Sequence, residues 1–289
     1  MLSYRLFRVV LEVRSNGGAT LTSTNDHSDS DPSLSDSDDF SGLDDHRLAA
    51  ILADKAGRAL TALREQDHPG GIDPWDLRDK GDQLAHNLLM AELARYRPND
   101  IVMSEEGADD RRRMGAARTW IVDPLDGTHD YPFLDSIEWA VHVALVEDQR
   151  PTAAAVAVPG LDQVFCTDND GPGEPTERDQ PLIISGRSNA YLASQVADVV
   201  GGQVTACGSS GVKAMLVVSG AVDVYVHASG LYEWDVCAPA AVAQSLGMVV
   251  TDLGGDEILY NKSQPIVRGL VVSRPEFAEV TRETLDRLV

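Results

Sequence analysis

Apolar residues recur at helical spacing once the strongly polar N-terminal stretch ends. One stripe runs through residues 44–66 and a second through residues 84–93, with apolar positions three or four residues apart. Such spacing places the apolar side chains on one face of a helix. The pattern predicts two amphipathic helices, the second with Asp82 at its N-cap and Pro98 just after its end.

Short apolar runs of strand length follow these helices. The runs at residues 101–103 and 120–122 each lead into acidic residues, which predicts strands that deliver carboxylates to one edge of a sheet. Three more runs, at residues 138–146, 152–158 and 163–167, are joined by short polar or glycine-containing links. Links of that length favour antiparallel hairpins.

Strands and helices alternate after the loop at residues 168–180, which is rich in Gly, Pro and acidic residues. In chain order we expect a strand at 182–185, helices at 189–199 and 210–218, a strand at 222–227, a helix at 235–246, strands at 248–251 and 266–272, and a helix at 275–288. This alternation is typical of an α/β unit. The chain should therefore contain an N-terminal α+β subdomain at residues 42–180, with the antiparallel sheet, and a C-terminal α/β subdomain at residues 181–289.

The N-terminal residues differ in composition from the rest. Eight aspartates and no Lys or Arg occur between Asp26 and Asp45. A segment of this kind buries too little apolar surface to offset its conformational entropy. We expect residues 1–41 to form a disordered acidic leader.

The charge of the chain excludes one class of function. Its 289 residues include 24 Lys and Arg against 46 Asp and Glu, a formal charge of −22. A nucleic-acid binder that works through a basic face is excluded by this balance. No apolar run approaches the roughly 20 residues that span a bilayer. Three widely spaced cysteines suggest neither a disulfide framework nor a zinc clip, so we expect a cytoplasmic protein without nucleic-acid or membrane partners.

Carboxylates stand where four of the expected elements begin or end. They are Asp82, Glu105, Asp123 with Asp126, and Asp235. Oxygen ligands of this kind suit a hard divalent cation such as Mg²⁺. Each carboxylate alone also fits a solvated turn or a helix cap. Their joint placement at element ends favours a metal site.

The loop at residues 123–128 (DPLDGT) is the most specific of these segments. Haloacid-dehalogenase-type phosphatases use an aspartyl nucleophile in a similar loop, but with the two acidic residues two positions apart. Here Asp123 and Asp126 are three positions apart. This spacing favours a metal-activated water over an aspartyl-phosphate intermediate.

Three motifs together resemble one family. They are residues 104–106 (SEE), 120–128 (WIVDPLDGT) and 234–241 (WDVCAPAA). The resemblance is to the lithium-sensitive, Mg²⁺-dependent phosphatases, which include inositol monophosphatase, fructose-1,6-bisphosphatase and 3'(2'),5'-bisphosphate nucleotidase. It covers residues 44–280 and implies a layered αβαβα sandwich and a homodimer.

The resemblance also implies metal ligands and a catalytic pair. Glu105, Asp123 and the Leu125 carbonyl would hold one Mg²⁺, and Asp123, Asp126 and Asp235 a second. A third ion would contact Glu105 through waters. The remaining site residues implied are the catalytic pair Asp82 and Thr128 and the substrate-binding residues Gly127, Arg187, Ser209, Ser210 and Lys213.

Two segments point to one branch of this family. Residues 208–213 (GSSGVK) begin an expected helix whose amides form an anion site, with Lys213 as an added charge. This segment and residues 185–189 (SGRSN) resemble the CysQ-type bisphosphate nucleotidases. The chain departs from the family pattern at three positions: Gly186 and Val212 are insertions in these segments, and Asp79 replaces a usual Thr three residues before Asp82.

The resemblance implies a specific reaction. It is removal of the 3'-phosphate of adenosine 3',5'-bisphosphate in sulfate assimilation, with 3'-phosphoadenylyl sulfate as a second substrate. Two alternatives remain open, namely an inositol or fructose-bisphosphate phosphatase and a non-catalytic metal- or nucleotide-binding regulator.

Overall fold

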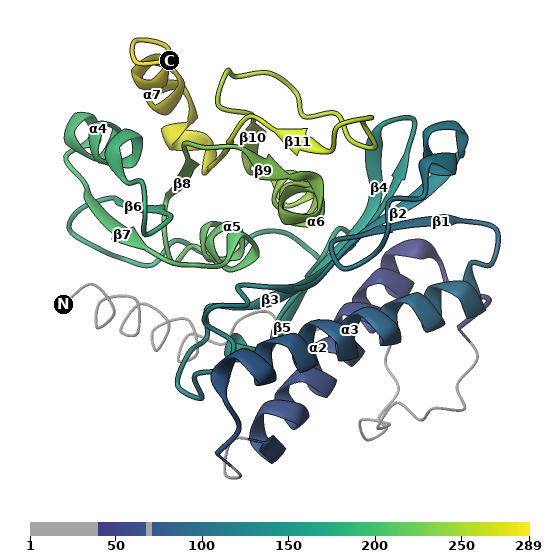
Figure 1. Cartoon of the computed structure of the whole chain (residues 1–289). Helices are drawn as coiled ribbons and strands as arrows, with labels where there is room; N and C mark the ends of the chain where they lie inside the picture. Colours follow the sequence, from purple (N-terminus) through teal and green to yellow (C-terminus); the bar gives the residue numbers. More distant parts are fainter. Residues whose placement is uncertain (1–39, 68–70) are drawn as a thin grey trace, which may run out of the picture.

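The computed structural model describes residues 40–67 and 71–289 (Figure 1), and the predicted acidic leader lies almost entirely outside them. Within the described residues, no helix is both long enough and apolar enough to cross a lipid bilayer.

The first half of the described chain forms a five-stranded sheet that two long helices cover on one face. The helices are α2 (Asp45–Asp67) and α3 (Pro74–Tyr96), and the strands are β1 (Ile101–Ser104), β2 (Arg118–Asp126), β3 (Ala140–Glu147), β4 (Arg150–Val158) and β5 (Gln163–Cys166). Two short 3₁₀ turns are η2 (Arg111–Gly115) and η3 (Pro159–Leu161). The strands are neighbours in chain order, with β1 parallel to β2 and every later pair antiparallel, so the predicted hairpins are confirmed.

The second half contains another five-stranded sheet in the order β10-β12-β8-β6-β7. Its strands are β6 (Leu182–Ser185), β7 (Gln203–Ala206), β8 (Val224–His227), β10 (Val249–Thr251) and β12 (Leu270–Ser273). The short strands β9 (Leu231–Tyr232) and β11 (Ile266–Val267) pair with each other. The helices of this half are α4 (Tyr191–Val200), α5 (Ser210–Val218), α6 (Glu233–Ser245) and α7 (Pro275–Leu285).

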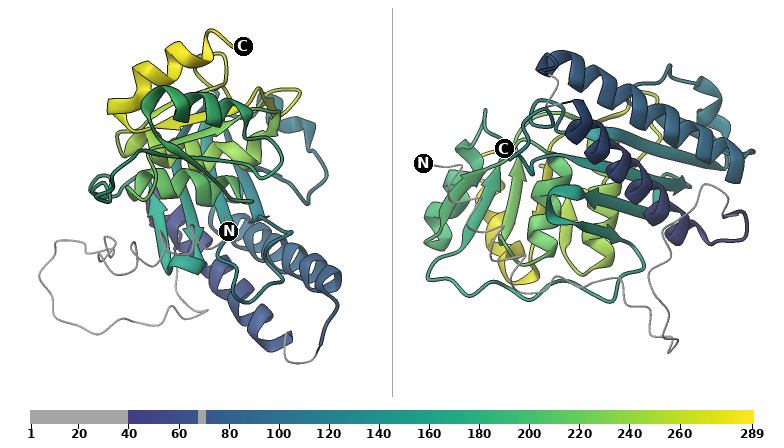
Figure 2. Two further views of the ribbon diagram at one scale, coloured as in Figure 1. Left: turned by 90° about the vertical axis from the view of Figure 1, so that its left-hand side faces the viewer. Right: turned by 90° about the horizontal axis from the view of Figure 1, so that it is seen from below.

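The alternation of side chains along the strands produces five layers. Val141 and Val143 of β3 pack with residues of α2 and α3, whereas Ala140 and Ala144 on the opposite face pack with residues of α5 and α6. In the second sheet, Ile183 packs toward α4 and α7, while its neighbour Ile184 faces α5 and α6. Helices α5 and α6 are thus enclosed between the two sheets (Figures 1 and 2), and the predicted αβαβα sandwich is confirmed.

The predicted start of the second helix is wrong. Helix α3 begins at Pro74, and the side chain of Asp73 caps it by accepting a hydrogen bond from the Trp75 amide. The dipeptide Asp73-Pro74, which looks like a turn, is also a good helix start because Pro at the first position has no amide to satisfy. Asp82 therefore lies in the third turn of α3 and is not its N-cap.

The predicted strand at residues 266–272 is two strands in the structure. Gly269, with φ +82°, separates β11 from β12, and a Cβ at this position would lie 2.5 Å from the His227 carbonyl oxygen. The short strand β7 escaped the sequence analysis because only two of its four residues are apolar.

Candidate active site

Three carboxylates meet where the end of β2 lies against the start of α6. Asp123, Asp126 and Asp235 each offer an oxygen, and these three atoms lie within 4.8 Å of one another. In a regular strand, residues three apart point to opposite faces. The pairing of β2 with β3 shifts register between Asp123 and Asp126, and this irregularity lets both carboxylates face α6.

Glu105 reaches the same place from β1. Because β1 is parallel to β2, their C-terminal ends share one edge of the sheet, and the Glu105 amide donates to the Val122 carbonyl. The charges of Glu105 and Asp123 act on each other across this edge. Desolvation and the charge of Asp235 raise the pKa of Glu105 to about 7, although this residue stays in contact with solvent at the rim. Full burial and the neighbouring carboxylates also raise the pKa of Asp123.

Asp126 is held differently, at the N-terminus of α5. Its carboxylate accepts hydrogen bonds from the Ser210 amide at 3.2 Å, the Gly211 amide at 2.7 Å and the Ser209 hydroxyl at 2.5 Å. Burial opposes its ionisation, but His142, with smaller contributions from Lys213 and Ser209, lowers the pKa of Asp126 to about 2. The predicted substrate residues Ser209 and Ser210 thus contact Asp126 directly.

Lys213 supports this arrangement from inside. Its side chain is buried, and its Nζ donates to the carbonyl oxygens of Cys207, Gly208 and Ser209 at 3.2, 2.8 and 2.7 Å. All three protons of the ammonium group are therefore engaged. Lys213 was predicted to bind a phosphate group of the substrate. In the structure its ammonium group lies beneath the loop that leads into α5.

Arg187 lies at the surface and is paired with two acidic residues. Its guanidinium donates to both carboxylate oxygens of Asp130 at 2.8 Å and also to Glu138. Glu138 in turn accepts from the Gly208 amide at 2.8 Å. Half of the Arg187 side chain remains exposed, so it combines a fixed position with access to solvent.

The predicted catalytic pair comes from α3 and from the residue that follows Gly127. Asp82 on α3 is half-buried, and desolvation together with Glu106 and Glu105 raises its pKa to about 7. Thr128 follows Gly127, which has φ +87° and approaches the Glu138 backbone too closely for any side chain. Asp82 is therefore suited to accept a proton near neutral pH.

His142, a fully buried residue of β3, was not predicted from the sequence as a site residue. Its Nδ1 lies 3.1 Å from the Trp234 carbonyl oxygen, and its Nε2 lies 3.3 Å from a carboxylate oxygen of Asp126. His142 is also the partner of Asp123 in the β2–β3 register. A histidine within an apolar run looks like a core residue. The antiparallel pairing with β2 was the one signal that could have linked it to Asp123.

The donor set fits hard divalent cations. Among the described residues, nothing forms a hydrogen bond with the buried Oδ2 atom of Asp123. Buried carboxylates so close together repel one another unless cations or protons neutralise them. Oxygen donors without cysteine favour Mg²⁺ or Mn²⁺ over softer metals.

We expect the free energy of unfolding of the metal-free protein to fall as the pH rises from about 4 to about 7. Glu105 and Asp82 have pKa values of about 7 in the folded chain and Asp235 of about 6, against roughly 4 when unfolded. The folded state thus holds more protons in this window, and the stability present below pH 4 is lost as these groups ionise. The lowered pKa of Asp126 makes the free energy of unfolding rise with pH, but only below about pH 4.

Urea unfolding in EDTA across this pH range measures the slope. Added Mg²⁺ should reduce the pH dependence of the free energy of unfolding, since bound cations neutralise the carboxylates in place of protons. Equal slopes with and without Mg²⁺ would show that the cluster binds no cation.

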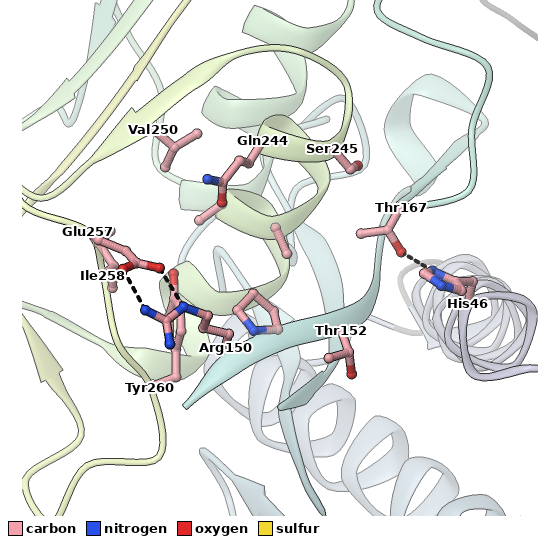
Figure 3. Close-up of a pocket in the computed structure, with 13 residues that line it drawn as sticks. His46, Arg150, Thr152, Thr167, Gln244, Ser245, Val250, Glu257, Ile258 and Tyr260 are labelled. Carbon is pink, nitrogen blue, oxygen red and sulfur yellow. Dashed lines mark hydrogen bonds and ion pairs between the residues drawn. The ribbon is translucent and has the colours of Figure 1, made fainter. Parts of the chain in front are cut away.

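A separate cavity of about 360 Å³ lies at the other end of α6 (Figure 3). Its walls include Gln244 and Ser245 of α6 and the ion pair of Arg150 with Glu257. None of the carboxylates of the acidic cluster lines it. The cavity is therefore distinct from the candidate active site.

Comparisons with known proteins agree with this geometry. The model of the inositol monophosphatase family matches residues 45–287. A 3'-phosphoadenosine 5'-phosphate phosphatase of Mycobacterium leprae is 38% identical over 251 residues, which cover 82% of this chain and 92% of the relative. The 3'(2'),5'-bisphosphate nucleotidase CysQ of Escherichia coli is 29% identical over 72% of this chain and 91% of its own length. The crystal structure of CysQ from Bacteroides thetaiotaomicron, a member of the same family, superimposes with a TM-score of 0.66 and 26% identity, covering 81% of this chain and 98% of that one.

Proposed function

The chain belongs to the inositol monophosphatase family, and from this premise we propose that it is a phosphoric monoester hydrolase that removes the 3'-phosphate of adenosine 3',5'-bisphosphate to give AMP. The observation that carries the proposal is the convergence of Asp123, Asp126 and Asp235 within 4.8 Å. The names of the relatives from Mycobacterium leprae and Escherichia coli support the choice of substrate.

We assign the metal-holding role to five residues, with Mg²⁺ as the ion and two to three ions in each chain. The ligands would be Glu105, Asp123, the carbonyl of Leu125, Asp126 and Asp235. When bound, such ions lower the pKa of water and neutralise the charge of the phosphoryl group. The network of hydrogen bonds to Asp126 would keep this ligand ionised and in place.

The other residues would bind the substrate and move protons. Asp82 would accept a proton from the attacking water, a role that its raised pKa of about 7 supports. Thr128 would orient that water. Arg187, held by Asp130 and half-exposed, would contact a phosphate group.

We propose that the enzyme acts in sulfate assimilation. A 3'-phosphatase for this nucleotide fits sulfate assimilation, and 3'-phosphoadenylyl sulfate carries the same 3'-ester. We further propose a homodimer in the cytoplasm.

Phosphate release from a panel of substrates tests the proposed activity. At saturating Mg²⁺, we expect kcat/KM to be at least about tenfold higher for adenosine 3',5'-bisphosphate than for inositol 1-phosphate or fructose 1,6-bisphosphate. A tenfold ratio is a difference of about 1.4 kcal/mol in transition-state binding, which one additional contact supplies. The variant Asp82→Asn controls for contaminating phosphatases.

Two results would decide among the alternatives. Equal turnover of inositol 1-phosphate would contradict the proposed specificity. Binding of nucleotide without release of phosphate would favour the non-catalytic regulator. Inhibition by Li⁺ is expected at the second metal position.

A further inference from the structure

Trp75, at the start of α3, has an exposed indole ring. Sixty per cent of this residue is exposed, whereas Trp120 and Trp139 are fully buried. The guanidinium of Arg78 lies over the indole, 4.6 Å from the ring centroid. A single exposed aromatic residue is ordinary on a protein surface. Trp75 differs from such residues in its contacts with neighbouring side chains.

Helix α3 connects Trp75 with Asp82. Residues seven positions apart lie on the same face of a helix, two turns and about 10 Å from each other. Arg78 lies between them, and its charge acts on the Asp82 carboxyl in the direction of a lower pKa. The exposed indole and the proposed proton acceptor are therefore on one face of α3.

A second, independent contact connects Trp75 with the residue after the loop at 123–128. The imidazole of His129 meets the indole edge-on, with ring centroids 6.2 Å apart. His129 directly follows Thr128 in the chain. The indole thus lies beside both segments that carry the proposed catalytic pair.

We propose that Trp75 is the platform on which the purine base of the substrate stacks, a role that rests on the proposed function. In a nucleoside 3',5'-bisphosphate, one sugar separates the base from the ester that is cleaved. The base must therefore bind near the acidic cluster, and Trp75 lies two helix turns from Asp82 and in contact with His129. Inositol phosphates lack a π face, so the platform discriminates in favour of nucleotides.

The guanidinium of Arg78 extends this platform. It covers one face of the indole, and the large exposed fraction of Trp75 leaves the other face accessible. The guanidinium also donates to the Asp79 carboxylate at 3.0 Å, which holds it in place over the ring. Stacked rings beside a cation suit a nucleotide better than a neutral aromatic ligand.

A double-mutant cycle between protein and substrate tests this inference. Trp75→Ala should raise KM for adenosine 3',5'-bisphosphate by about 10- to 100-fold, the range expected for loss of one base–aromatic stack, with little change in kcat. Ribose 3,5-bisphosphate, which lacks the base, should bind the wild type as weakly as the nucleotide binds the variant. Combining both changes should cost little more than either alone. Trp75→Phe should restore most of the affinity.

Fluorescence provides a readout that needs no turnover. AMP should quench the emission of the wild type, which has four tryptophans, and the quench should be largely absent in Trp75→Phe. Equal effects of Trp75→Ala on the two substrates, or an unchanged quench, would overturn the proposal. Wild-type protein that releases no phosphate from the nucleotide would instead contradict the proposed function. Melting temperatures of both variants identify any loss of folding.

Discussion

Replacement of Asp235 by Asn should lower kcat for phosphate release by at least about 10²-fold and weaken the binding of Mg²⁺. Asp235 is one of three carboxylates within 4.8 Å, and loss of its charge removes several kcal/mol of interaction with a bound cation. Asn keeps an oxygen that can accept from the Tyr232 amide, the bond by which Asp235 caps α6. The fold should therefore persist.

The same substitution should stabilise the protein in the absence of metal. Desolvation and the charge of Asp126 raise the pKa of Asp235 to about 6, so its ionised form destabilises the metal-free cluster at neutral pH. Thermal unfolding with EDTA and with Mg²⁺ measures both effects. The variant should melt at a higher temperature than the wild type in EDTA and gain less from Mg²⁺.

The control for this substitution is Asp198→Asn. Asp198 is an exposed residue of α4, remote in the fold from the layer that holds the acidic cluster. It should leave both activity and the gain from Mg²⁺ unchanged. Full activity of Asp235→Asn would contradict the assignment of Asp235 as a ligand.

Replacement of His142 by Ala should weaken Mg²⁺ binding by about 10- to 100-fold, the usual cost of losing a side chain that orients metal ligands. His142 contacts Asp126 through Nε2 at 3.3 Å and the Trp234 carbonyl, next to Asp235, through Nδ1 at 3.1 Å. One imidazole thus sets the spacing between two proposed ligands. The activity lost at low Mg²⁺ should return in large part when Mg²⁺ is raised.

Two conservative variants separate these contacts. Asn at position 142 can retain the bond to the Trp234 carbonyl, and Gln can reach Asp126 instead. Binding of Mn²⁺ to the protein without substrate, followed by electron paramagnetic resonance, reports affinity directly. Val141→Ala is the matched control, because Val141 lies on the same strand but faces α2 and α3. A similar loss of Mn²⁺ affinity in Val141→Ala would reduce the role of His142 to packing.

The layers of the fold follow from the pattern of apolar residues. The continuous apolar run of β3 is buried on both faces, as a strand between two helical layers must be. The start of α3 was mispredicted because Asp73-Pro74 suits both a turn and a helix start. Whether this dipeptide forms a turn or begins a helix depends on the burial of Leu77, which is set by the tertiary structure.

The acidic cluster was predictable because its members stand at the ends of elements that meet at one sheet edge. The supporting residues were not. His142 lies in an apolar strand, and the direction of the Lys213 side chain depends on the path of the loop before α5. The fit of His142 also requires Gly211, since any Cβ there would collide with the imidazole Nε2. Such pairwise fits between distant segments leave no local pattern in the sequence.

We expect Glu105, which follows β1, and the carboxylates of β2 and α6 to bind divalent cations together. Anomalous X-ray diffraction from crystals of the wild-type protein soaked in Mn²⁺ tests it most directly. We expect anomalous peaks in contact with Asp123 and with Asp126 or Asp235, and the loss of at least one peak in Asp235→Asn. Millimolar Mn²⁺ that leaves this cluster without a peak would contradict it.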